Sequence, residues 1–526
     1  MITGKSYIGN EYSTLGDSTF KTFDPKLNVE TEWTFYESTN EVQQAVDLAW
    51  EAFLEFRYFS GVQKATFLRE IAKNIEGLGD ALVEVYCKET GLPEGRAKGE
   101  RGRTCFQLIT FADLVEEGSW VNATIDTAQP DREPLPKPDL RKMAIPLGPI
   151  AVFGASNFPL AYSTAGGDTA SALAAGCPVV VKSHPMHAGT GELVASAIIK
   201  AAKDTGMPNG VFSNLNSSGI EVGQLLAAHP KIKGIGFTGS IVGGRALFDK
   251  ASQREEPIPV FAEMGSVNPV VFLPEALKSN GMQWAKTYAG SITLGTGQFC
   301  TNPGLLLGLK SEALDEFVGM LSEEILTIAP SCMLHPNIIS KYDANKKVVL
   351  DEKNVEVMAD YPTGIAANHA RQTIARVDGQ VFIENPKLHQ EIFGPFSMVV
   401  ECANEQELTR AISGLEGQLT GTIVSEESEM GAYKTVIDVL ENRVGRLIFN
   451  GVPTGVEVAP SMQHGGPYPS STDSRFGAVG IDAIQRWVRP VSYQNWPDHL
   501  LPTALQNGNP LGIQRLINNK TTTDPI

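Results

Sequence analysis

The chain has 526 residues, too many for one ordinary hydrophobic core, so we expect two or three packed units. Its formal net charge of -17 argues against a nucleic-acid partner, because binding a phosphate backbone requires clustered Lys and Arg. No signal-peptide-like run opens the chain and no segment approaches the ~20 apolar residues of a membrane span, so we expect no membrane partner. Six cysteines without CxxC pairs predict neither a disulfide framework nor a zinc site, which favours a reducing, cytoplasmic location.

The predicted elements change character along the chain. From about residue 41 to 110, apolar side chains at spacings of three and four indicate amphipathic helices. Two extended segments follow, SWVNATIDTAQ and PDLRKMAIP, around a proline-rich turn. Short β-rich runs such as PIAVFGA, CPVVVK and IKGIGFT then alternate with helical stretches, and a second region of this kind ends near residue 449. The alternation predicts βαβ units and buried parallel sheets, hence an α/β fold.

A glycine cluster, GIGFTGSIVGG, follows a short apolar run and precedes the helical stretch RALFDKASQR. A strand, a glycine turn and a helix N-terminus together make a cradle for phosphate groups. The cluster is not a GxGxxG fingerprint, so a tight strand–helix connection without a ligand explains it equally well. Lys182, at the end of VVVK, is within reach of a ribose or phosphate in the first case and is simply solvated in the second.

Cys300 is the candidate nucleophile among the six cysteines. It lies in GTGQFCTNPG, where glycines on both sides let backbone N–H groups and a substrate approach the sulfur closely. A thiol with a pKa of ~8.5 is only a few per cent ionised at pH 7, so a reactive cysteine requires activation. The alternative is buried, inert packing, which is the usual role of a free cysteine.

Two polar residues at predicted strand ends complete the candidate site. Glu263 follows the run PVFA, and loss of hydration there would raise its pKa toward that of a general base; a strand-end salt bridge is the alternative. Asn157 in FGASNFP offers an amide donor for an oxyanion, or it simply forms the turn before Phe-Pro. His184 and His187 form an HxxH pair, but Pro185 between them and the lack of nearby acidic or cysteine ligands argue against a metal.

The order of these motifs resembles the aldehyde dehydrogenase superfamily. The resemblance runs through SNFP, VVVK, FTGSIVGG, AEMGSVNP, GQFCTNPG and EIFGP, and it spans nearly the whole chain. Three longer segments, AGGDTASALAAGCPVVVKSHPMHAGT, GQFCTNPGL and HGGPYPSSTDSRFGAVG, are similar to the NADP-linked branch, which includes 2-oxoglutarate semialdehyde (2,5-dioxopentanoate) dehydrogenases.

The resemblance implies two Rossmann-like parallel-sheet domains plus an extended β oligomerisation arm. A strand donated across a subunit boundary satisfies its own backbone groups, so we expect a homodimer or homotetramer. The implied parts are an NAD(P)-binding domain (1–119 and 148–260), a catalytic domain (261–447), the arm and C-terminal tail (120–147 and 485–526), and a segment that returns to the cofactor domain and the substrate entrance (448–484).

The resemblance also implies a role for each motif. Cys300 attacks the aldehyde, the Asn157 amide and the Cys300 backbone N–H hold the oxyanion, and Glu263 activates the water that hydrolyses the thioester. Because CoA-acylating relatives generally lack that glutamate, water is the expected acyl acceptor. The cofactor is NADP or NAD, no metal is expected, and the implied cofactor-binding residues are Gly154, Lys182, Gly239, Ser240, Gly244, Glu391 and Phe393.

The chain departs from the family pattern in two places. Many NAD-preferring members carry a glutamate three residues after the lysine, where this chain has Pro185; without that carboxylate a 2′-phosphate meets less repulsion, so NADP is slightly favoured. The Arg-Lys pair that semialdehyde dehydrogenases of another branch carry after NFP is missing here. We therefore expect Arg103, with Arg475 as the second candidate, to bind a distal substrate carboxylate, and Phe158 to contact the substrate.

The expected function is NAD(P)-dependent oxidation of an aldehyde, foremost 2-oxoglutarate semialdehyde, to the carboxylic acid through a thiohemiacetal and a thioester. Within the same class, the alternative is a broad-specificity or long-chain aldehyde dehydrogenase. A non-catalytic binding or structural relative is a remote alternative, because such a protein has no reason to keep both Cys300 and Glu263.

Overall fold

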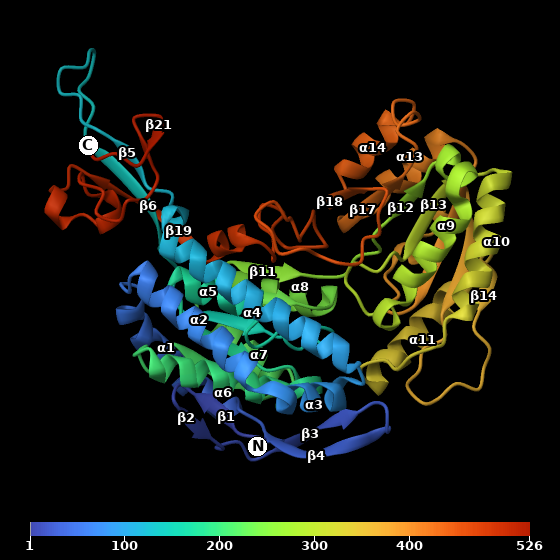
Figure 1. Cartoon of the computed structure of the whole chain (residues 1–526), viewed down its shortest axis with the longest axis horizontal. Helices are drawn as coiled ribbons and strands as arrows, with labels where there is room; N and C mark the ends of the chain where they lie inside the picture. Colours follow the sequence, from blue (N-terminus) through green and yellow to red (C-terminus); the bar gives the residue numbers. More distant parts are fainter. Residues whose placement is uncertain (1) are drawn as a thin grey trace.

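The structure is a computed structural model that describes residues 2–526 (Figure 1). A first seven-stranded sheet has the order β11-β10-β7-β8-β9-β1-β2. Its five strands from β11 to β9 are parallel, as the buried β-rich runs predict, and the N-terminal strands β1 and β2 add antiparallel at one edge. The bounds are β1 Ser6–Ile8, β2 Glu11–Ser13, β7 Ile150–Phe153, β8 Val179–Lys182, β9 Phe212–Leu215, β10 Gly234–Thr238 and β11 Val260–Glu263.

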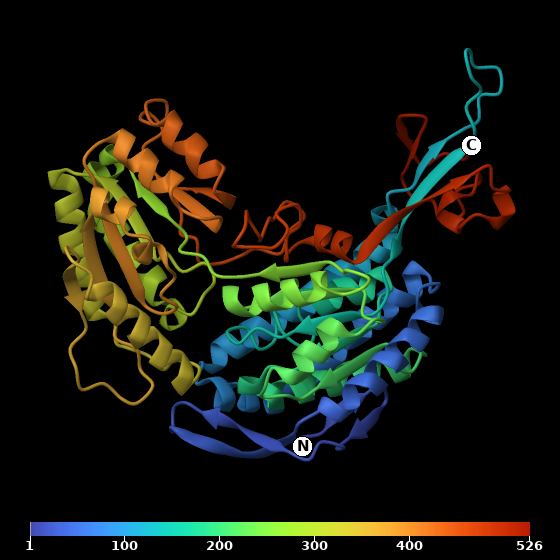
Figure 2. The ribbon, with the colours of Figure 1, turned by 180° about the vertical axis from the view of Figure 1, so that it is seen from behind.

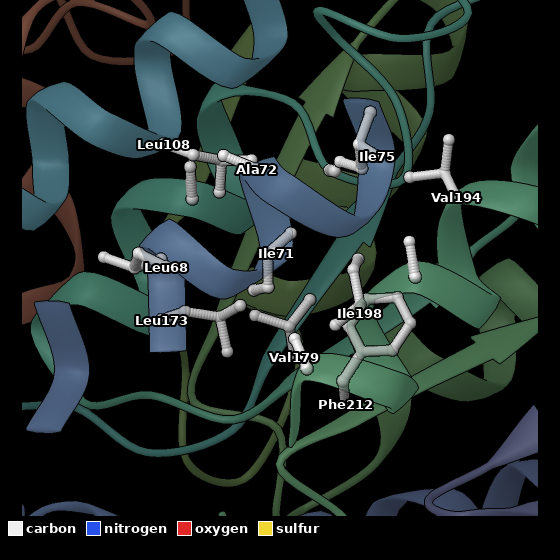
Figure 3. Close-up of a cluster of buried hydrophobic side chains, with 14 of the residues drawn as sticks. Leu68, Ile71, Ala72, Ile75, Leu108, Leu173, Val179, Val194, Ile198 and Phe212 are labelled. Atoms are coloured by element: carbon white, nitrogen blue, oxygen red, sulfur yellow. The ribbon is translucent and has the colours of Figure 1, made fainter. Parts of the chain in front are cut away.

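Helices cover both faces of this sheet. On one face, α2, α5 and α6 bury an apolar cluster in which Ile71, Leu173, Val179 and Ile198 point toward one another (Figure 3). On the other face, a second cluster joins α1, α7 and α8 to the strands. The expected helical region is confirmed as α1 to α4. The bounds are α1 Val42–Phe56, α2 Gly61–Gly77, α3 Gly79–Thr90, α4 Glu94–Glu117, α5 Gly167–Ala175, α6 Ala188–Asp204, α7 Glu221–Ala228 and α8 Ile241–Ser252.

A second seven-stranded sheet has the order β14-β15-β16-β13-β12-β17-β18 and is parallel except for β14. Its two faces also bury separate apolar clusters, so the expected α/β fold is confirmed. Its strands are β12 Val270–Phe272, β13 Leu305–Leu309, β14 Glu356–Asp360, β15 Thr373–Asp378, β16 Phe396–Cys402, β17 Gln418–Val424 and β18 Val444–Phe449. Its helices are α9 Pro274–Thr293, α10 Glu312–Thr327, α11 Pro336–Leu350, α12 Gly379–Glu384, α13 Glu405–Ser413 and α14 Lys434–Glu441.

A third sheet projects away from both units (Figures 1 and 2). It has the order β19-β6-β5-β20-β21, and its last two strands come from the C-terminal tail, which packs a small apolar core around Ile125 and Leu505. The remaining strands, β3 and β4, form a hairpin on the outside of the first unit. The bounds are β3 Thr19–Asp24, β4 Val29–Tyr36, β5 Thr124–Asp126, β6 Leu140–Pro146, β19 Val488–Gln494, β20 Arg515–Ile517 and β21 Lys520–Thr522.

Two further features bear on the expectations. Strand β11 pairs with β10 along its whole length and ends at Glu263, so the first sheet extends past the boundary expected at residue 260. Among the described residues, no helix combines the length and apolar character needed to cross a membrane.

Candidate functional site

The site lies where the two parallel-sheet units face each other. Parallel strands present their carboxyl ends at one edge of a sheet, and side chains for chemistry collect there. Strands β8 and β11 end at this edge with Lys182 and Glu263, and the loop after β7 carries Asn157. Cys300 comes from the second unit, on the loop that connects a short 3-10 turn, Leu294–Gly297, to β13.

Cys300, His464 and Glu263 form a compact cluster. The Cys300 Sγ lies 3.6 Å from His464 Nε2, and the same nitrogen lies 2.9 Å from Glu263 Oε1. The side chains of His464 and Glu263 are only 1% and 4% exposed. The sequence analysis missed His464; the only signal for it was its place at the head of the motif HGGPYPSS.

Backbone pairing to β11 holds the segment that follows His464 in place. Glu263 and Ser471 form an isolated antiparallel bridge, and the Met264 N–H donates to the Ser470 carbonyl at 2.8 Å. On the other side of Glu263, the Ala262 N–H donates to the Thr472 hydroxyl at 2.9 Å. This segment therefore runs beside the strand that carries Glu263, which brings His464 within reach of the carboxylate.

The surroundings of Cys300 oppose ionisation of its thiol. Burial raises the pKa of Cys300 well above its ordinary value, and the negative charge of Glu263 raises the pKa further. The resting residue is therefore a neutral thiol that needs a base within reach. His464 Nε2 is placed to accept the thiol proton, and the imidazolium formed would then face the Glu263 carboxylate.

Asn157 and Asn268 hold the cysteine loop. Asn157 Nδ2 donates to the Gln298 carbonyl at 3.1 Å, which ties the loop after β7 to the residues just before the nucleophile. Asn268, just before β12, donates to the Cys300 carbonyl at 2.8 Å and the Asn302 carbonyl at 2.9 Å. The sequence analysis did not identify Asn268, because an asparagine that binds backbone carbonyls has no distinctive local pattern.

A cavity of about 290 Å³ leads to Cys300 from the side of α4. Its lining includes Arg103 and Phe158, both expected near a substrate, and also Arg96. The sequence analysis did not consider Arg96. The remaining lining residues are Gly95, Gly99, Glu100, Tyr162, Phe299, Cys300, Thr301, Gly455 and Val456.

Both arginines are held by the cavity wall. Arg103 donates to the Val456 carbonyl and, at 3.3 Å, to the Tyr162 hydroxyl. The Arg96 guanidinium lies between two aromatic rings, 4.2 Å from the Phe158 centroid and 4.9 Å from the Phe299 centroid. The Nε of each arginine is buried and has no hydrogen-bond partner among the described residues.

Arg475, the second expected carboxylate ligand, lies elsewhere. Its side chain is 78% exposed, and it makes two hydrogen bonds with Asp473, at 2.9 Å and 2.6 Å. The adjacent aspartate neutralises this guanidinium at the surface, so the structure does not support it as a residue of the cavity.

The residues expected to bind a nucleotide lie on the other side of Cys300. Burial lowers the pKa of Lys182 to about 8, and its ammonium donates to the Ser217 carbonyl at 2.7 Å. Burial raises the pKa of Glu391 to about 7, while a backbone hydrogen bond from Ser266 lowers it. Phe393 lines a small cavity together with Glu391.

The glycine turn leads directly into helix α8. Ser240 caps the helix by accepting from the Gly243 N–H at 3.2 Å, and Val242 in its first turn is 82% exposed. This N-terminus is open, and its dipole favours an anion such as a pyrophosphate. Ser240 and the preceding Gly239 lie at this open N-terminus.

At two other glycines expected to bind the cofactor, close packing by itself explains why the residue is glycine. A Cβ on Gly244 would lie 2.6 Å from Met264 Sδ, so glycine lets α8 approach β11 closely. A Cβ on Gly154 would lie 2.5 Å from Ser163 Oγ.

Replacing His464 by Asn tests its action on the thiol. We expect alkylation of Cys300 by iodoacetamide at pH 7 to slow at least about tenfold, because the buried thiol loses its base. Alkylation rates, measured by mass spectrometry of the Cys300 peptide, report this directly. His499→Asn, an exposed histidine on the arm, is the matched control; equal rates in both variants would contradict the role of His464.

Comparison with known proteins agrees with this geometry. The model of the aldehyde dehydrogenase family matches residues 13–489. The chain is 45% identical to the alpha-ketoglutaric semialdehyde dehydrogenase of Acinetobacter baylyi, over 99% of this chain and 99% of that protein. It is 44% identical to alpha-ketoglutaric semialdehyde dehydrogenase 2 of Azospirillum brasilense, with the same coverage.

Solved structures share the fold at lower identity. Methylmalonate-semialdehyde dehydrogenase from Oceanimonas doudoroffii superposes with a TM-score of 0.80 at 19% identity, covering 94% of this chain and 99% of that one. A betaine aldehyde dehydrogenase from Staphylococcus aureus in complex with NAD+ has a TM-score of 0.81 at 18% identity, covering 94% and 98%. The chain belongs to the aldehyde dehydrogenase family, and it is an NAD(P)-dependent oxidoreductase that converts an aldehyde to a carboxylic acid.

Proposed function

We propose that the substrate is a short aldehyde with an acidic group at its far end, foremost 2-oxoglutarate semialdehyde. The observation that carries this proposal is the cavity that joins the Cys300 sulfur to Arg96 and Arg103. The names of the two relatives at 45% and 44% identity support the same substrate. A long-chain aldehyde is a poorer fit, because an apolar tail would desolvate two half-buried guanidinium groups without compensating them.

The reaction starts with the transfer of the thiol proton to His464, and the Cys300 sulfur then bonds to the aldehyde carbon. The Asn157 amide has a second N–H besides the one bonded to Gln298, and with the Cys300 backbone N–H it would hold the oxyanion. Losing one such donor typically costs about 3–4 kcal/mol. NAD(P), when bound, would supply the hydride acceptor, and loss of hydride from the carbon on Cys300 would leave a thioester on the sulfur. Glu263 then takes a proton from water as the water attacks the thioester and releases the acid.

Replacing Glu263 by Gln separates the two halves of this reaction. We expect a burst of about one NAD(P)H per subunit followed by a stall, because the thioester forms but its hydrolysis lacks a base. Rapid-mixing absorbance of reduced nicotinamide, with 2-oxoglutarate semialdehyde as substrate, measures the burst. Cys300→Ala should give no burst while still binding nucleotide. Steady turnover of the Glu263 variant near the wild-type rate would exclude this role.

Arg103 and Arg96 are proposed to bind the distal carboxylate of the substrate. A guanidinium offers a planar fork of donors that matches a carboxylate. The Arg103 Nε–H makes no hydrogen bond with a described residue, whereas the Arg96 Nε lies 3.5 Å from Glu100 Oε2. The aromatic rings around Arg96 and the Tyr162 hydroxyl beside Arg103 keep the two cations in place. Side chains held in this way lose little rotamer entropy when the substrate binds.

Alanine variants of each arginine test this assignment. A hydrogen bond to a charged group contributes about 1.5–3 kcal/mol, so we expect KM for 2-oxoglutarate semialdehyde to rise about 10- to 100-fold. KM for butanal, which has no carboxylate, should change little. Arg475→Ala is the control because it lies outside the cavity. A similar loss with both aldehydes would indicate general damage to the cavity instead of carboxylate recognition.

For the cofactor we propose NADP or NAD, with NADP slightly favoured. Lys182 and Glu391 are proposed to hold the two riboses, and the turn at Gly239 and Ser240 the pyrophosphate. Pro185 opens a short 3-10 turn just after β8, so this chain has no carboxylate at the position where many relatives bind the adenosine ribose. Less repulsion of a 2′-phosphate supports NADP. All six cysteines are free thiols, which supports a reducing cytoplasmic location.

The pKa values of Glu391 and Lys182 predict how nucleotide affinity depends on pH. Ionised Glu391 accepts hydrogen bonds from ribose hydroxyls, so affinity should rise as pH increases through about 7. Protonated Lys182 donates to the nucleotide, so affinity should fall as pH increases through about 8. Fluorescence titration with NAD, which lacks a titrating 2′-phosphate, measures the maximum expected between these values.

Each single variant should remove the pH dependence of nucleotide affinity on one side of the maximum. Glu391→Gln should flatten the acidic limb and Lys182→Met the alkaline limb, whereas Lys250→Met on the exposed side of α8 should leave both. A profile whose two limbs persist in both site variants would show that other groups control binding.

We also propose that two copies associate through the arm. Strand β19 pairs with β6 on one side only, and β18 pairs with β17 on one side only, so two sheet edges are free. Free edges are sites for pairing with another chain. Leu447 and Phe449 on β18 are 42% and 45% exposed, which gives this edge apolar side chains for a second copy to cover.

Replacing Leu447 and Phe449 together by Asp tests this interface. We expect the double variant to shift from the wild-type oligomer toward monomer, because two charges would be buried without partners. Sedimentation velocity measures the change. Leu326→Asp on α10, at a position 38% exposed, is the matched control. An unchanged oligomer in the double variant would place the interface elsewhere.

A further inference from the structure

The catalytic cluster has the composition and spacing of a metal site. One ligand atom each from Glu263, Cys300 and His464 lies within 4.8 Å of the other two, and no other such group of three occurs between residues 2 and 526. A tetrahedral zinc ion with ordinary bond lengths separates sulfur and nitrogen ligands by about 3.6 Å, and nitrogen and oxygen ligands by about 3.4 Å. The observed distances are 3.6 Å from Sγ to Nε2 and 2.9 Å from Nε2 to Oε1. The Sγ–Nε2 distance already fits, and the Nε2–Oε1 distance has to lengthen by about half an ångström.

A second observation points to a small ligand at the same place. Neither carboxylate oxygen of Glu263 makes a hydrogen bond of good geometry with a described residue, although the side chain is 4% exposed. Its ionisable neighbour is His464, whose Nε2 lies 2.9 Å from Oε1. A buried carboxylate that lacks hydrogen bonds of good geometry is costly, and a cation or a water molecule compensates it.

We propose that zinc binds reversibly to Cys300, His464 and Glu263 and switches the enzyme off. The thiol releases its proton to solvent, the thiolate, Nε2 and one carboxylate oxygen coordinate the ion, and a water molecule occupies the fourth position. Coordination withdraws charge from the sulfur and places the ion where the aldehyde carbon would approach, so the sulfur no longer attacks the aldehyde. Thiolate and imidazole favour zinc over magnesium or calcium.

This ion would act as an inhibitor and not as a cofactor. Zinc reaches the sulfur through the 290 Å³ cavity that admits the aldehyde. The thiolate and the carboxylate together balance the charge of the ion. The nearby cation Arg446 interacts electrostatically with Cys300, but its guanidinium already donates to the carbonyls of Gly455 and Pro453. The inference depends only on the cluster geometry and not on which aldehyde is the substrate.

Direct metal binding to the nucleotide-free enzyme tests the proposal. Titration against a chromophoric chelator should give one zinc per subunit with a dissociation constant of about 1 µM or lower. Cobalt in place of zinc should produce a thiolate-to-metal charge-transfer band, and alkylation of Cys300 should abolish it. Zinc should block aldehyde oxidation until EDTA restores it, whereas magnesium should have no effect.

Variants distinguish a three-residue site from simple blocking of a thiol. His464→Asn removes a direct ligand, so zinc affinity should fall more than the about 10- to 100-fold typical of an outer-shell change. Glu263→Gln should also weaken binding, whereas Cys87→Ser and His499→Asn, outside the cluster, should leave it unchanged. Equal zinc affinity in His464→Asn and wild type, or the absence of the cobalt band, would overturn the proposal. These readouts require no turnover, so they stand apart from the tests of substrate identity.

Discussion

The chemistry of this enzyme depends on the backbone pairing between strand β11 and the segment that follows His464. The bridge between Glu263 and Ser471 and the flanking hydrogen bonds fix where the carboxylate and the imidazole lie. Cys300 belongs to the second unit, and Asn157 and Asn268 hold its loop against the same edge. Side chains from three separate stretches of chain therefore meet within a few ångströms, where proton transfer is possible.

The same burial that brings these groups together works against the nucleophile. Burial and the charge of Glu263 both raise the pKa of Cys300, so the carboxylate that we propose as the base for hydrolysis hinders formation of the thiolate. His464 lies between the two and can relieve this conflict by taking the thiol proton. A buried thiol that ionises only when a base accepts its proton is also protected from reaction with other electrophiles. The close contact of three good ligands makes the same cluster suited to zinc.

The residues proposed to bind the substrate and those proposed to bind the cofactor belong to different parts of the site. The cavity beside α4 contains two arginines held by aromatic rings, whereas the edge of the first sheet presents Lys182 and the open N-terminus of α8, and Glu391 comes from the second unit just before β16. This separation lets an anionic aldehyde and an anionic dinucleotide approach one reacting atom without repelling each other strongly.

The sequence alone determined the features that depend on local pattern. Helical periodicity predicted α1 to α4, the β-rich runs predicted parallel sheets, and the motifs pointed to Cys300, Glu263 and Asn157, which the fold brings to one place. Only the tertiary structure decided which distant side chains join them. His464 is 164 residues from Cys300 in the chain, and Arg96 has no motif that marks it as a cavity residue. Arg475 was a reasonable candidate by charge, yet Asp473 holds it at the surface. Periodicity and motifs reflect interactions between near neighbours, whereas a site is built by contacts that exist only after the chain has packed.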